Sequence, residues 1–537
     1  MTEAELFGPL SSGCILGRLN IATTAGRVVF ADAVKIPGAR SPHGKCPFET
    51  AMALALNWLH DSLSLFFTTA LFVVHLLVVA RAITRPNRTP SSRVAWVAVI
   101  MFLPLLGVIA YLLLGETSIG GQRIKRLQEV ESRMPLPDDA AFVPETVESR
   151  AVPLFDFGRS INGFRAVAGN RFTLMEDSDA AIDSLVTDIG RAVHHVHISF
   201  YIWLDDNNGG KVADAVANAA QRGVRCRVMV DALGSRAFTR SGRWEQLRAA
   251  GVRTLATLDD VPRLGHLAIG RIDLRNHRKI VVIDNEIGYC GSQNCADPAF
   301  RIKAKFAPWV DIFLRFQGPL VRQQQHLFLS AWIAETGEQL EALPSAAPLP
   351  PRFEPGTVAQ VFGTGPTSPA NAMSDMFVAT MYAARDELLV TTPYFVPDEA
   401  GLRALCAASR RGVKTTIIFP KRNDSWLVGS ACSSAYAALL SSGVSVYEYP
   451  LGLLHTKSMT VDGQLALVGS ANMDRRSLEL NYENCVLIAD EATTQVIRQR
   501  QLTYVTASHL VDAENVRAWP FHIRLVQNAI GMLAPVL

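Results

Sequence analysis

The amino-acid sequence predicts an α/β protein with two related halves, preceded by a pair of membrane-spanning helices. A strand–helix–strand pattern that occurs twice predicts the α/β halves, and a short polar motif is repeated with it. Two long apolar runs without charged residues, both near the N-terminus, predict the membrane helices.

The composition is that of a folded protein. Hydrophobic residues make up 49% of the 537 residues and charged residues 19%, which excludes wholesale disorder. The 52 Lys and Arg residues nearly balance the 49 Asp and Glu residues, which gives a formal net charge of +3. A protein that coats a polyanion needs a larger positive excess, so nucleic acid is not an expected partner.

Residues 1–51 differ from the rest of the chain. They show no helical periodicity, and no basic segment precedes an apolar segment as it does in a signal peptide. We therefore expect residues 1–51 to be a disordered extension, and Met52 is a plausible alternative start of the native chain.

Residues 52–118 are expected to form a transmembrane helical hairpin. Residues 63–80 and 94–114 contain no Asp, Glu, Lys or Arg, and each run is long enough as a helix to cross a bilayer. Two buried core helices are the alternative, but two such runs joined by an arginine-rich loop favour the membrane. Basic residues also follow the second run, so the positive-inside rule gives no orientation, and the cytoplasmic side is our working expectation.

The rest of the chain contains two similar segments, residues 198–235 and 388–420. In each, an Ala-rich helical stretch ends at Arg-Gly and lies between two short apolar strands, and Gly223 and Gly412 suit the ends of these helices. Five prolines in the region 341–355 predict a linker between the halves, which we place at residues 140–340 and 356–537. The run at residues 519–533 predicts a C-terminal helix that either lies at a membrane interface or packs on the second half.

The most informative pattern is a His-x-Lys-x4-Asp motif followed by Gly-Ser-x-Asn. It occurs twice with the same internal spacing, and both parts are offset by 178 residues, from 277 to 455 and from 291 to 469. The candidate site residues are His277, Lys279, Asp284, Ser292 and Asn294 in the first half, and His455, Lys457, Asp462, Ser470 and Asn472 in the second half.

The spacing suggests how these residues meet. On a strand, residues i and i+2 share a face, so each histidine is expected beside its lysine. Asp284-Asn285 and Asp462-Gly463 are hairpin turn signals, so the serine and asparagine should return beside the histidine on the neighbouring strand. Each aspartate falls in the turn or on the opposite face, and we expect it to support the site through an ion pair.

These residue types suit a phosphate group. Ammonium, hydroxyl and carboxamide groups can bind the non-bridging oxygens, and an imidazole can attack phosphorus or deliver a proton. Displacement at phosphorus needs a nucleophile on one side and a proton donor for the leaving group on the other, which two histidines meeting across a pseudo-twofold interface supply. A metal centre is the competing interpretation, but a lysine beside each histidine would repel a cation, so no metal is expected.

The duplicated motif resembles the phospholipase D superfamily, and four further segments resemble bacterial cardiolipin synthases. The similarity covers about residues 54–537. The segments are Tyr111-Leu-Leu-Leu-Gly-Glu116, Tyr201-Ile-Trp203, Ala307-Pro-Trp-Val-Asp311 and Arg476-Ser-Leu-Glu-Leu-Asn-Tyr-Glu483.

The resemblance implies a fold of two phospholipase D-like α/β/α halves and one reaction without metal or organic cofactor. A phosphatidyl group moves from one phosphatidylglycerol to another through a phosphohistidine, which gives cardiolipin and glycerol. It implies that His277 attacks and His455 acts as acid and base, with the reverse assignment open. The lysines and asparagines of the motifs would hold phosphate oxygens.

The family pattern also includes a carboxylate after Gly-Ser-x-Asn that orients a histidine. Glu483 matches this place, but the first half has Lys305 at the equivalent spacing, and Asp311 is the substitute candidate. The implied location is the bacterial inner membrane, with several passes, and the implied partner is membrane lipid. A lipid-hydrolysing phospholipase D, a transferase with phosphatidylethanolamine as donor, a nuclease and an inactive scaffold are the alternatives.

Overall fold

The computed structural model describes residues 47–86, 90–115, 121–137, 149–259, 274–339 and 350–532. The chain forms two compact units, Met1–Val73 and Val74–Leu537. Most of the extension expected at residues 1–51 lies outside the described residues. The last five residues of the expected disordered segment, 47–51, form the start of a helix.

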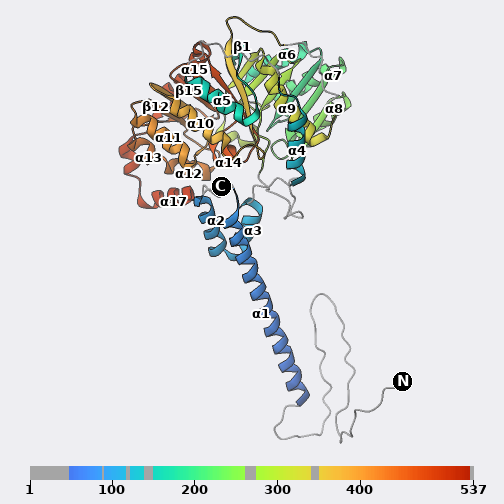
Figure 1. The fold of residues 1–537 in the computed structure, drawn as a ribbon, viewed down its shortest axis with the longest axis vertical. Coiled ribbons are helices and arrows are strands. Elements are labelled where there is room, and N and C mark those ends of the chain that lie inside the picture. Colours follow the sequence, from blue (N-terminus) through green and yellow to red (C-terminus); the bar gives the residue numbers. More distant parts are fainter. Residues whose placement is uncertain are drawn as a thin grey trace, which may run out of the picture. The chain divides into compact units, whose positions relative to one another are not determined.

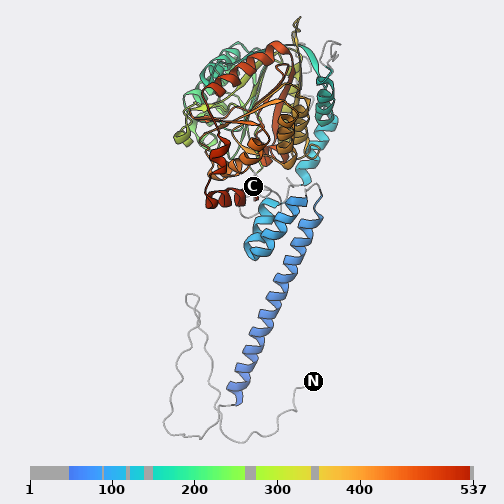
Figure 2. The same ribbon diagram turned by 90° about the vertical axis from the view of Figure 1, so that its left-hand side faces the viewer.

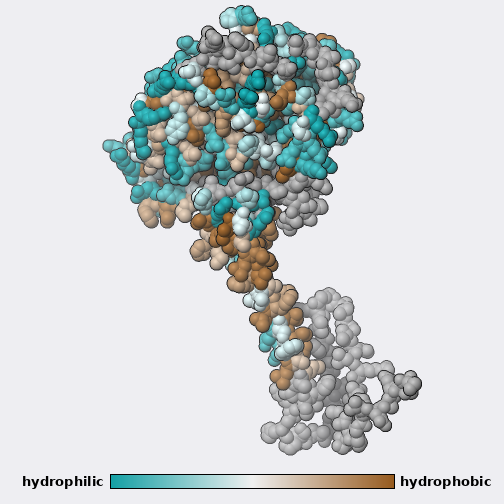
Figure 3. All heavy atoms as spheres, in the orientation of Figure 1, coloured by the Kyte–Doolittle hydropathy of each residue, from teal (hydrophilic) through white to brown (hydrophobic). Residues whose placement is uncertain are grey.

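The first predicted membrane run lies inside one long helix, α1 (Pro47–Thr84). Within it, Met52–Thr84 is apolar and long enough to cross a bilayer, and its most apolar stretch is not buried inside the protein. The helix is mostly brown, and thus hydrophobic, in Figure 3.

The second predicted run, residues 94–114, is not a continuous helix, and this corrects the two-helix hairpin. It is divided between α2 (Pro90–Phe102), α3 (Pro104–Ala110) and a π-helical turn (Tyr111–Gly115). Pro104 has no N–H to donate to the preceding turn, and its ring clashes with the carbonyl four residues back, so the helix stops there. Among the described residues, α1 alone has the length and apolar character to span a membrane.

The helices α2 and α3 fold back on each other. Gly107 lies so close to α2 that an added Cβ would be 2.3 Å from the carbonyl oxygen of Val99. The rings of Trp96 and Tyr111 pack edge to face with centroids 5.4 Å apart. The outer surface of this helix pair is apolar and exposed, with Val94, Met101, Phe102, Leu103, Leu105 and Leu106.

The remainder of the chain is built on one 15-stranded sheet (Figure 1). The order is β19-β13-β12-β10-β15-β16-β18-β9-β1-β8-β6-β5-β2-β3-β4. The first-half strands are β1 (Val167–Leu174), β2 (His195–Phe200), β3 (Arg225–Asp231), β4 (Arg253–Thr257), β5 (Ile280–Ile283), β6 (Ile287–Gly291) and β8 (Phe313–Gln317). Those of the second half are β9 (Thr357–Thr364), β10 (Glu387–Thr391), β12 (Lys414–Pro420), β13 (Ser445–Tyr449), β15 (Ser458–Val461), β16 (Leu465–Gly469), β18 (Glu483–Ala489) and β19 (His509–Leu510).

The strand order supports the prediction of two related α/β halves. In the first half, β2, β3 and β4 are parallel and β5, β6, β8 and β1 are added antiparallel. The second half repeats this with β10, β12 and β13, then β15, β16, β18 and β9. The halves join through antiparallel pairing of β1 with β9. Apart from β19, equivalent strands of the two halves therefore follow in the same order from either edge of the sheet to this join. An antiparallel join of two like halves gives the expected pseudo-twofold relation.

Helices cover both faces of the sheet. Successive strand residues point to opposite faces. Ile280 and Val282 therefore pack in the cluster beneath α9 (Leu320–Thr336), and Val281 and Ile283 pack in the cluster beneath α6 (Ser178–Arg191) and α7 (Asn207–Gln221). The helices are α4 (Gly121–Arg133), α5 (Ala151–Asn162), α6 (Ser178–Arg191), α7 (Asn207–Gln221), α8 (Gly242–Ala249), α9 (Leu320–Thr336), α10 (Ala372–Ala383), α11 (Glu399–Arg410), α12 (Trp426–Ser434), α13 (Tyr436–Ser441), α14 (Arg475–Glu479), α15 (Glu491–Thr506), α16 (Ala513–Arg517) and α17 (Phe521–Met532).

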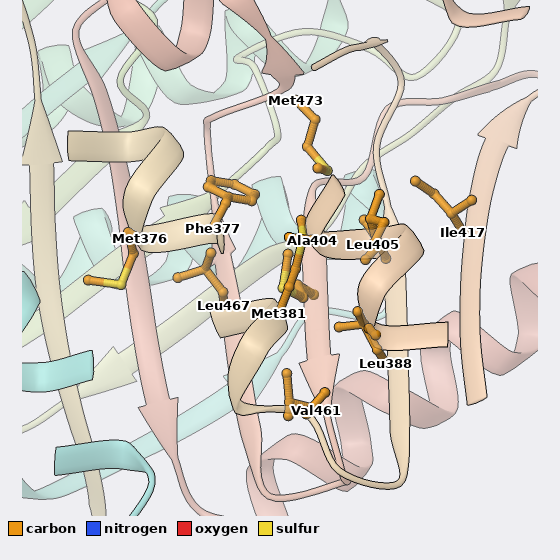
Figure 4. Close-up of a cluster of buried hydrophobic side chains, with 14 of the residues drawn as sticks. Met376, Phe377, Met381, Leu388, Ala404, Leu405, Ile417, Val461, Leu467 and Met473 are labelled. Atoms are coloured by element: carbon orange, nitrogen blue, oxygen red, sulfur yellow. The ribbon is translucent and has the colours of Figure 1, made fainter. Parts of the chain in front are cut away.

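The core of the second half lies under α10 and α11. Figure 4 shows Phe377 and Met381 of α10 gathered with the strand residues Leu388, Val461 and Leu467 and with Leu405 of α11. Met376 of α10 belongs to the same buried cluster. This burial makes the strands read as nearly continuous apolar runs in the sequence.

The sequence also predicts glycines at two helix ends, a linker and a C-terminal helix. Gly223 and Gly412 each follow a helix with a φ of +92°, as expected for glycine at a helix end. The described part of the expected linker, residues 350–355, contains no helix or strand, and residues 340–349 lie outside the described part. The C-terminal helix is present as α17.

Candidate active site

Two β-hairpins position the repeated motifs. The predicted turns are present, since Asp284 and Asn285 have φ of +51° and +60°, and Asp462 and Gly463 have φ of +51° and +67°. β5 pairs with β6 and β15 with β16, which brings each Gly-Ser-x-Asn segment back toward the start of its motif. The histidine and lysine of each motif lie not on the strand but in the extended segment directly before it.

The two histidines are each held by a carboxylate from the other half. His277 Nδ1 lies 2.9 Å from Oε2 of Glu483, and His455 Nδ1 lies 2.6 Å from Oδ1 of Asp311. All four side chains are buried. Each half therefore completes the site of its partner half.

Backbone pairing between the halves sets these contacts. Asn276 forms a parallel bridge with Tyr482, and β14 (Leu453–Leu454) pairs in parallel with β7 (Trp309–Val310). The next residue on each strand then lies beside its counterpart, which places His277 with Glu483 and His455 with Asp311. Asp311 is thus the structural counterpart of Glu483. It lies farther along the sequence from its Gly-Ser-x-Asn segment than Glu483 does, because the first-half connection is longer and contains the six-residue 3₁₀ segment Arg301–Phe306.

The motif serines contact the carboxylates. Ser292 Oγ donates a hydrogen bond to Asp311, and Ser470 Oγ donates one to Glu483. We expected these hydroxyls to bind substrate phosphate, but in the structure their contacts position the two carboxylates, because the hairpins return them behind the histidines and not into the open space.

The motif lysines are buried behind the histidines. Lys279 Nζ donates to the carbonyl oxygen of His277 at 2.8 Å, and Lys457 Nζ donates to that of His455 at 2.7 Å. Both ammonium groups therefore lie directly behind the backbone that carries the imidazoles.

The motif aspartates lie away from the histidines, in the hairpin turns. Asp284 accepts hydrogen bonds from three successive backbone N–H groups at Val193, His194 and His195. Asp462 likewise accepts from the backbone at residues 385–387, and it forms an ion pair with Arg150. The expected ion pair is present at Asp462 but, among the described residues, not at Asp284. Each aspartate braces its hairpin against the start of the strand beside it, β2 or β10, away from both motif histidines.

Both histidines line one cavity of about 370 Å³, together with Asn294 and Asn472. These are the four predicted site residues that reach the cavity. The wall also contains the cations Arg275, Lys303, Arg475 and Arg476, the carboxylates Asp424 and Asp474, and the aromatic rings of Tyr201, Phe300, Trp309 and Tyr394.

Electrostatics keep both imidazoles neutral in this cavity. Burial, opposed by Glu483, lowers the pKa of His277 to about 4; burial and Lys457, opposed by Asp311, lower the pKa of His455 to about 4. Burial favours the protonated carboxyls, but the paired histidine, the lysine and the serine outweigh it and lower the pKa of Glu483 and Asp311 to about 2. A neutral imidazole that donates Nδ1–H to a carboxylate carries its lone pair on Nε2.

The lysines are also perturbed. Burial is the main cause that lowers the pKa of Lys279 to about 7 and that of Lys457 to about 8. In the part of the chain that the structure describes, no group of three or more His, Cys, Asp or Glu side chains is arranged to hold a metal ion.

Comparison with known proteins identifies the family. The family described as "Cardiolipin synthase, PLD-like domain" matches residues 185–307 and 377–501, and "Phospholipase_D-nuclease N-terminal" matches residues 70–116. The chain is 36% identical over 493 residues to "Cardiolipin synthase A" of Edwardsiella ictaluri (strain 93-146), covering 88% of this chain and 100% of that protein. The chain belongs to the cardiolipin synthase family.

A second relative belongs to the same family, and one solved structure is similar in fold. "Cardiolipin synthase A" of Serratia proteamaculans (strain 568) is 36% identical over 472 residues, which cover 86% of this chain and 96% of that protein. The crystal structure of phosphatidylserine synthase from Haemophilus influenzae Rd KW20 matches 73% of this chain and 100% of its own length, with a TM-score of 0.53 and 12% identity. That similarity shows a shared fold.

This cardiolipin synthase family member has cavity residues that the sequence analysis did not assign. Trp309 packs against His455 with centroids 4.5 Å apart, and Tyr201 against His277 at 4.9 Å; both lie in segments noted only for family resemblance. Lys303 of the first half forms an ion pair with Asp424 of the second half at the cavity wall. No repeat or spacing in the sequence marks that pair.

Proposed function

We propose that this family member transfers the phosphatidyl group of one phosphatidylglycerol to the terminal hydroxyl of another, giving cardiolipin and glycerol. The observation that carries the proposal is the single cavity lined by both histidines, each held by a carboxylate of the opposite half. Membership of the cardiolipin synthase family supports the same reaction.

In the first proposed step, His277 Nε2 attacks phosphorus and the bond from phosphorus to the glycerol oxygen breaks. His455 gives its Nε2 proton to the departing glycerol oxygen, and the enzyme is left with a phosphatidyl group on His277. The bound phosphodiester anion favours the protonated form of His455 that this step needs.

In the second step, His455 Nε2 takes the proton from the hydroxyl of the acceptor phosphatidylglycerol. The acceptor oxygen attacks the phosphohistidine, the P–N bond breaks and His277 is restored. Glu483 and Asp311 fix each ring with Nε2 available, and each stabilises the imidazolium that forms. The pseudo-twofold arrangement also permits the reverse assignment of the two histidines.

The cavity wall suits a glycerol phosphate headgroup. Arg275, Arg475 and Arg476 attract the phosphodiester anion. The side-chain carbonyl oxygens of Asn472 and Asn481 are buried at this wall and have no hydrogen-bond partner among the described residues. Hydroxyl groups of a glycerol headgroup can supply the donors that these oxygens require.

A reaction with phosphatidylglycerol as the only lipid tests the proposed function. Purified full-length protein should form cardiolipin and free glycerol in equal amounts, measured by lipid chromatography and an enzymatic glycerol assay. Phosphatidic acid with glycerol and no cardiolipin would mean that the enzyme is a hydrolase. A requirement for added phosphatidylethanolamine would mean that the donor is a different lipid.

The lysine pKa values predict how substrate binding depends on pH. Lys279 and Lys457 lose their charge as the pH rises through about 7 and about 8, so their attraction for the anionic headgroup is present below this range and lost above it. We expect the KM for phosphatidylglycerol to rise between about pH 6 and about pH 9, with a smaller change in kcat. A KM that stays constant over this range would contradict the role of the lysines.

We also propose a membrane location for this family member. The apolar helix α1 would anchor it in the bacterial cell membrane. Arg81 lies in the last turn of α1, and Arg85 and Arg93 follow the helix, which favours the cytoplasmic side for the catalytic unit. The exposed apolar surface of α2 and α3 would enter the same membrane without crossing it, since neither helix has the necessary length.

A further inference from the structure

The C-terminal helix α17 exposes an apolar face. At about 100° per residue, Phe521, Leu525, Val526 and Met532 fall within an arc of about 140°, which also contains His522 and Ala529. Phe521 is 71% exposed, Leu525 56% and Met532 76%. The opposite face packs on α12, where an added Cβ at Gly531 would lie 2.8 Å from Oγ of Ser434. Ile530, at the edge between the two faces, is buried. A helix whose outer face is apolar normally has a partner that covers this face.

The neighbouring helix α12 extends this surface to the rim of the catalytic cavity. Trp426 and Leu427, in its first turn, are exposed, with Trp426 at 69%. The residues on either side of them, Ser425 and Val428, line the cavity that contains both histidines. We define the docking face as Trp426, Leu427, Phe521, Leu525, Val526 and Met532.

The helix pair α2–α3 lies at the same end of the catalytic unit. Figures 1 and 2 both place α17, α2 and α3 at this end. Ser92 of α2 accepts a hydrogen bond of 3.2 Å from Arg475, and Arg475 lines the cavity. The cavity is therefore bordered by α12 of the docking face and by an arginine that contacts the apolar helix pair.

We infer that the docking face rests on the surface of an anionic bilayer and presents the cavity to the lipid headgroups. This inference rests on the proposed lipid substrate. The face is next to the exposed apolar surface of α2–α3, and Lys421, Arg422 and Arg524 beside it are exposed cations that suit anionic headgroups. A lipid that enters from this side keeps its acyl chains in the bilayer while its phosphate reaches the histidines.

Contact with lipid can be measured without reference to activity. The six cysteines in the described residues are buried, so replacing Cys14 and Cys46 by serine leaves a background for single labels. Leu525→Cys carrying an environment-sensitive fluorophore, in full-length protein reconstituted in phosphatidylglycerol vesicles, should show a blue shift and quenching by spin-labelled lipid. Val496→Cys on α15, also exposed, is the matched control and should show neither.

Absence of quenching at position 525 would overturn the inference, whether or not the enzyme makes cardiolipin. Formation of 525–525 cross-links without lipid quenching would also overturn it, because a second copy would then cover the face. Failure of the proposed reaction would instead appear as missing cardiolipin with quenching intact.

Kinetics provide an independent measurement. Leu525→Asp should lower the rate on phosphatidylglycerol vesicles by about tenfold and leave the rate on monomeric short-chain phosphatidylglycerol unchanged. Val496→Asp is the control and should alter neither rate. An equal loss of both rates in Leu525→Asp, with an unchanged melting temperature, would contradict docking.

Discussion

Replacing either His277 or His455 by alanine is expected to lower cardiolipin formation by more than about 10⁴-fold. His277 is the nucleophile and later the leaving group, and His455 is the acid and then the base, so each substitution removes a group that both steps need. Neither histidine can take the position of the other, because each is fixed by its own carboxylate. The rate is measured with purified full-length protein and phosphatidylglycerol as the only lipid.

The control for this prediction is His509→Ala, since His509 is exposed on β19 and distant in the sequence from both motifs. It should keep the full rate. Membrane extraction and melting temperature should be compared for all three variants, because loss of a buried imidazole also leaves a buried carboxylate without its partner. Substantial cardiolipin formation by either cavity variant, in folded protein, would contradict the two-histidine mechanism.

The second large effect is expected at the carboxylates that cross between the halves. Glu483→Gln and Asp311→Asn keep the size of each side chain but remove its charge, so each should lower the rate by about 10² to 10⁴-fold. Asp284→Asn is the matched control, because its carboxylate accepts hydrogen bonds from backbone N–H groups at the start of β2, away from His277 and His455. It should lower the melting temperature more than the rate per folded molecule.

A substrate with an activated leaving group separates the two carboxylates. Phosphatidyl-p-nitrophenol needs no proton on its leaving oxygen, so Asp311→Asn, which acts through His455, should recover most of its first-step rate. Glu483→Gln, which acts through His277, should not. Equal recovery by both variants would show that the carboxylates do not act on different histidines.

Most of the correct predictions, namely the two halves and their hairpins, came from the repeated motif. Strict spacing of His277, Ser292 and Asn294, and of their counterparts, predicted the hairpins, because turn residues and strand periodicity are local properties. The sequence also indicates Glu483 and Asp311 as candidates. That each carboxylate pairs with the histidine of the other half depends on backbone bridges between segments that are distant in the sequence. No local pattern contains that information.

The errors have equally physical causes. The uncharged run at residues 94–114 has the composition of a membrane span, but Pro104 interrupts its hydrogen bonding and Gly107 lets the two parts pack together. The motif aspartates Asp284 and Asp462 lie at a fixed spacing from the histidines, and we expected each to support the site through an ion pair. The hairpin carries them to its far end, where they bind backbone N–H groups.

The most direct measurement of the central claim uses the His455→Ala variant and 32P-labelled phosphatidyl-p-nitrophenol. Because this substrate needs no acid, the variant should release one nitrophenol per enzyme, and peptide mapping should find the labelled phosphatidyl group on His277. The His277→Ala variant should give neither burst nor label. A label on a residue outside the two motifs, or a full burst from His277→Ala with no histidine adduct, would contradict attack by one of two histidines on a shared phosphorus atom.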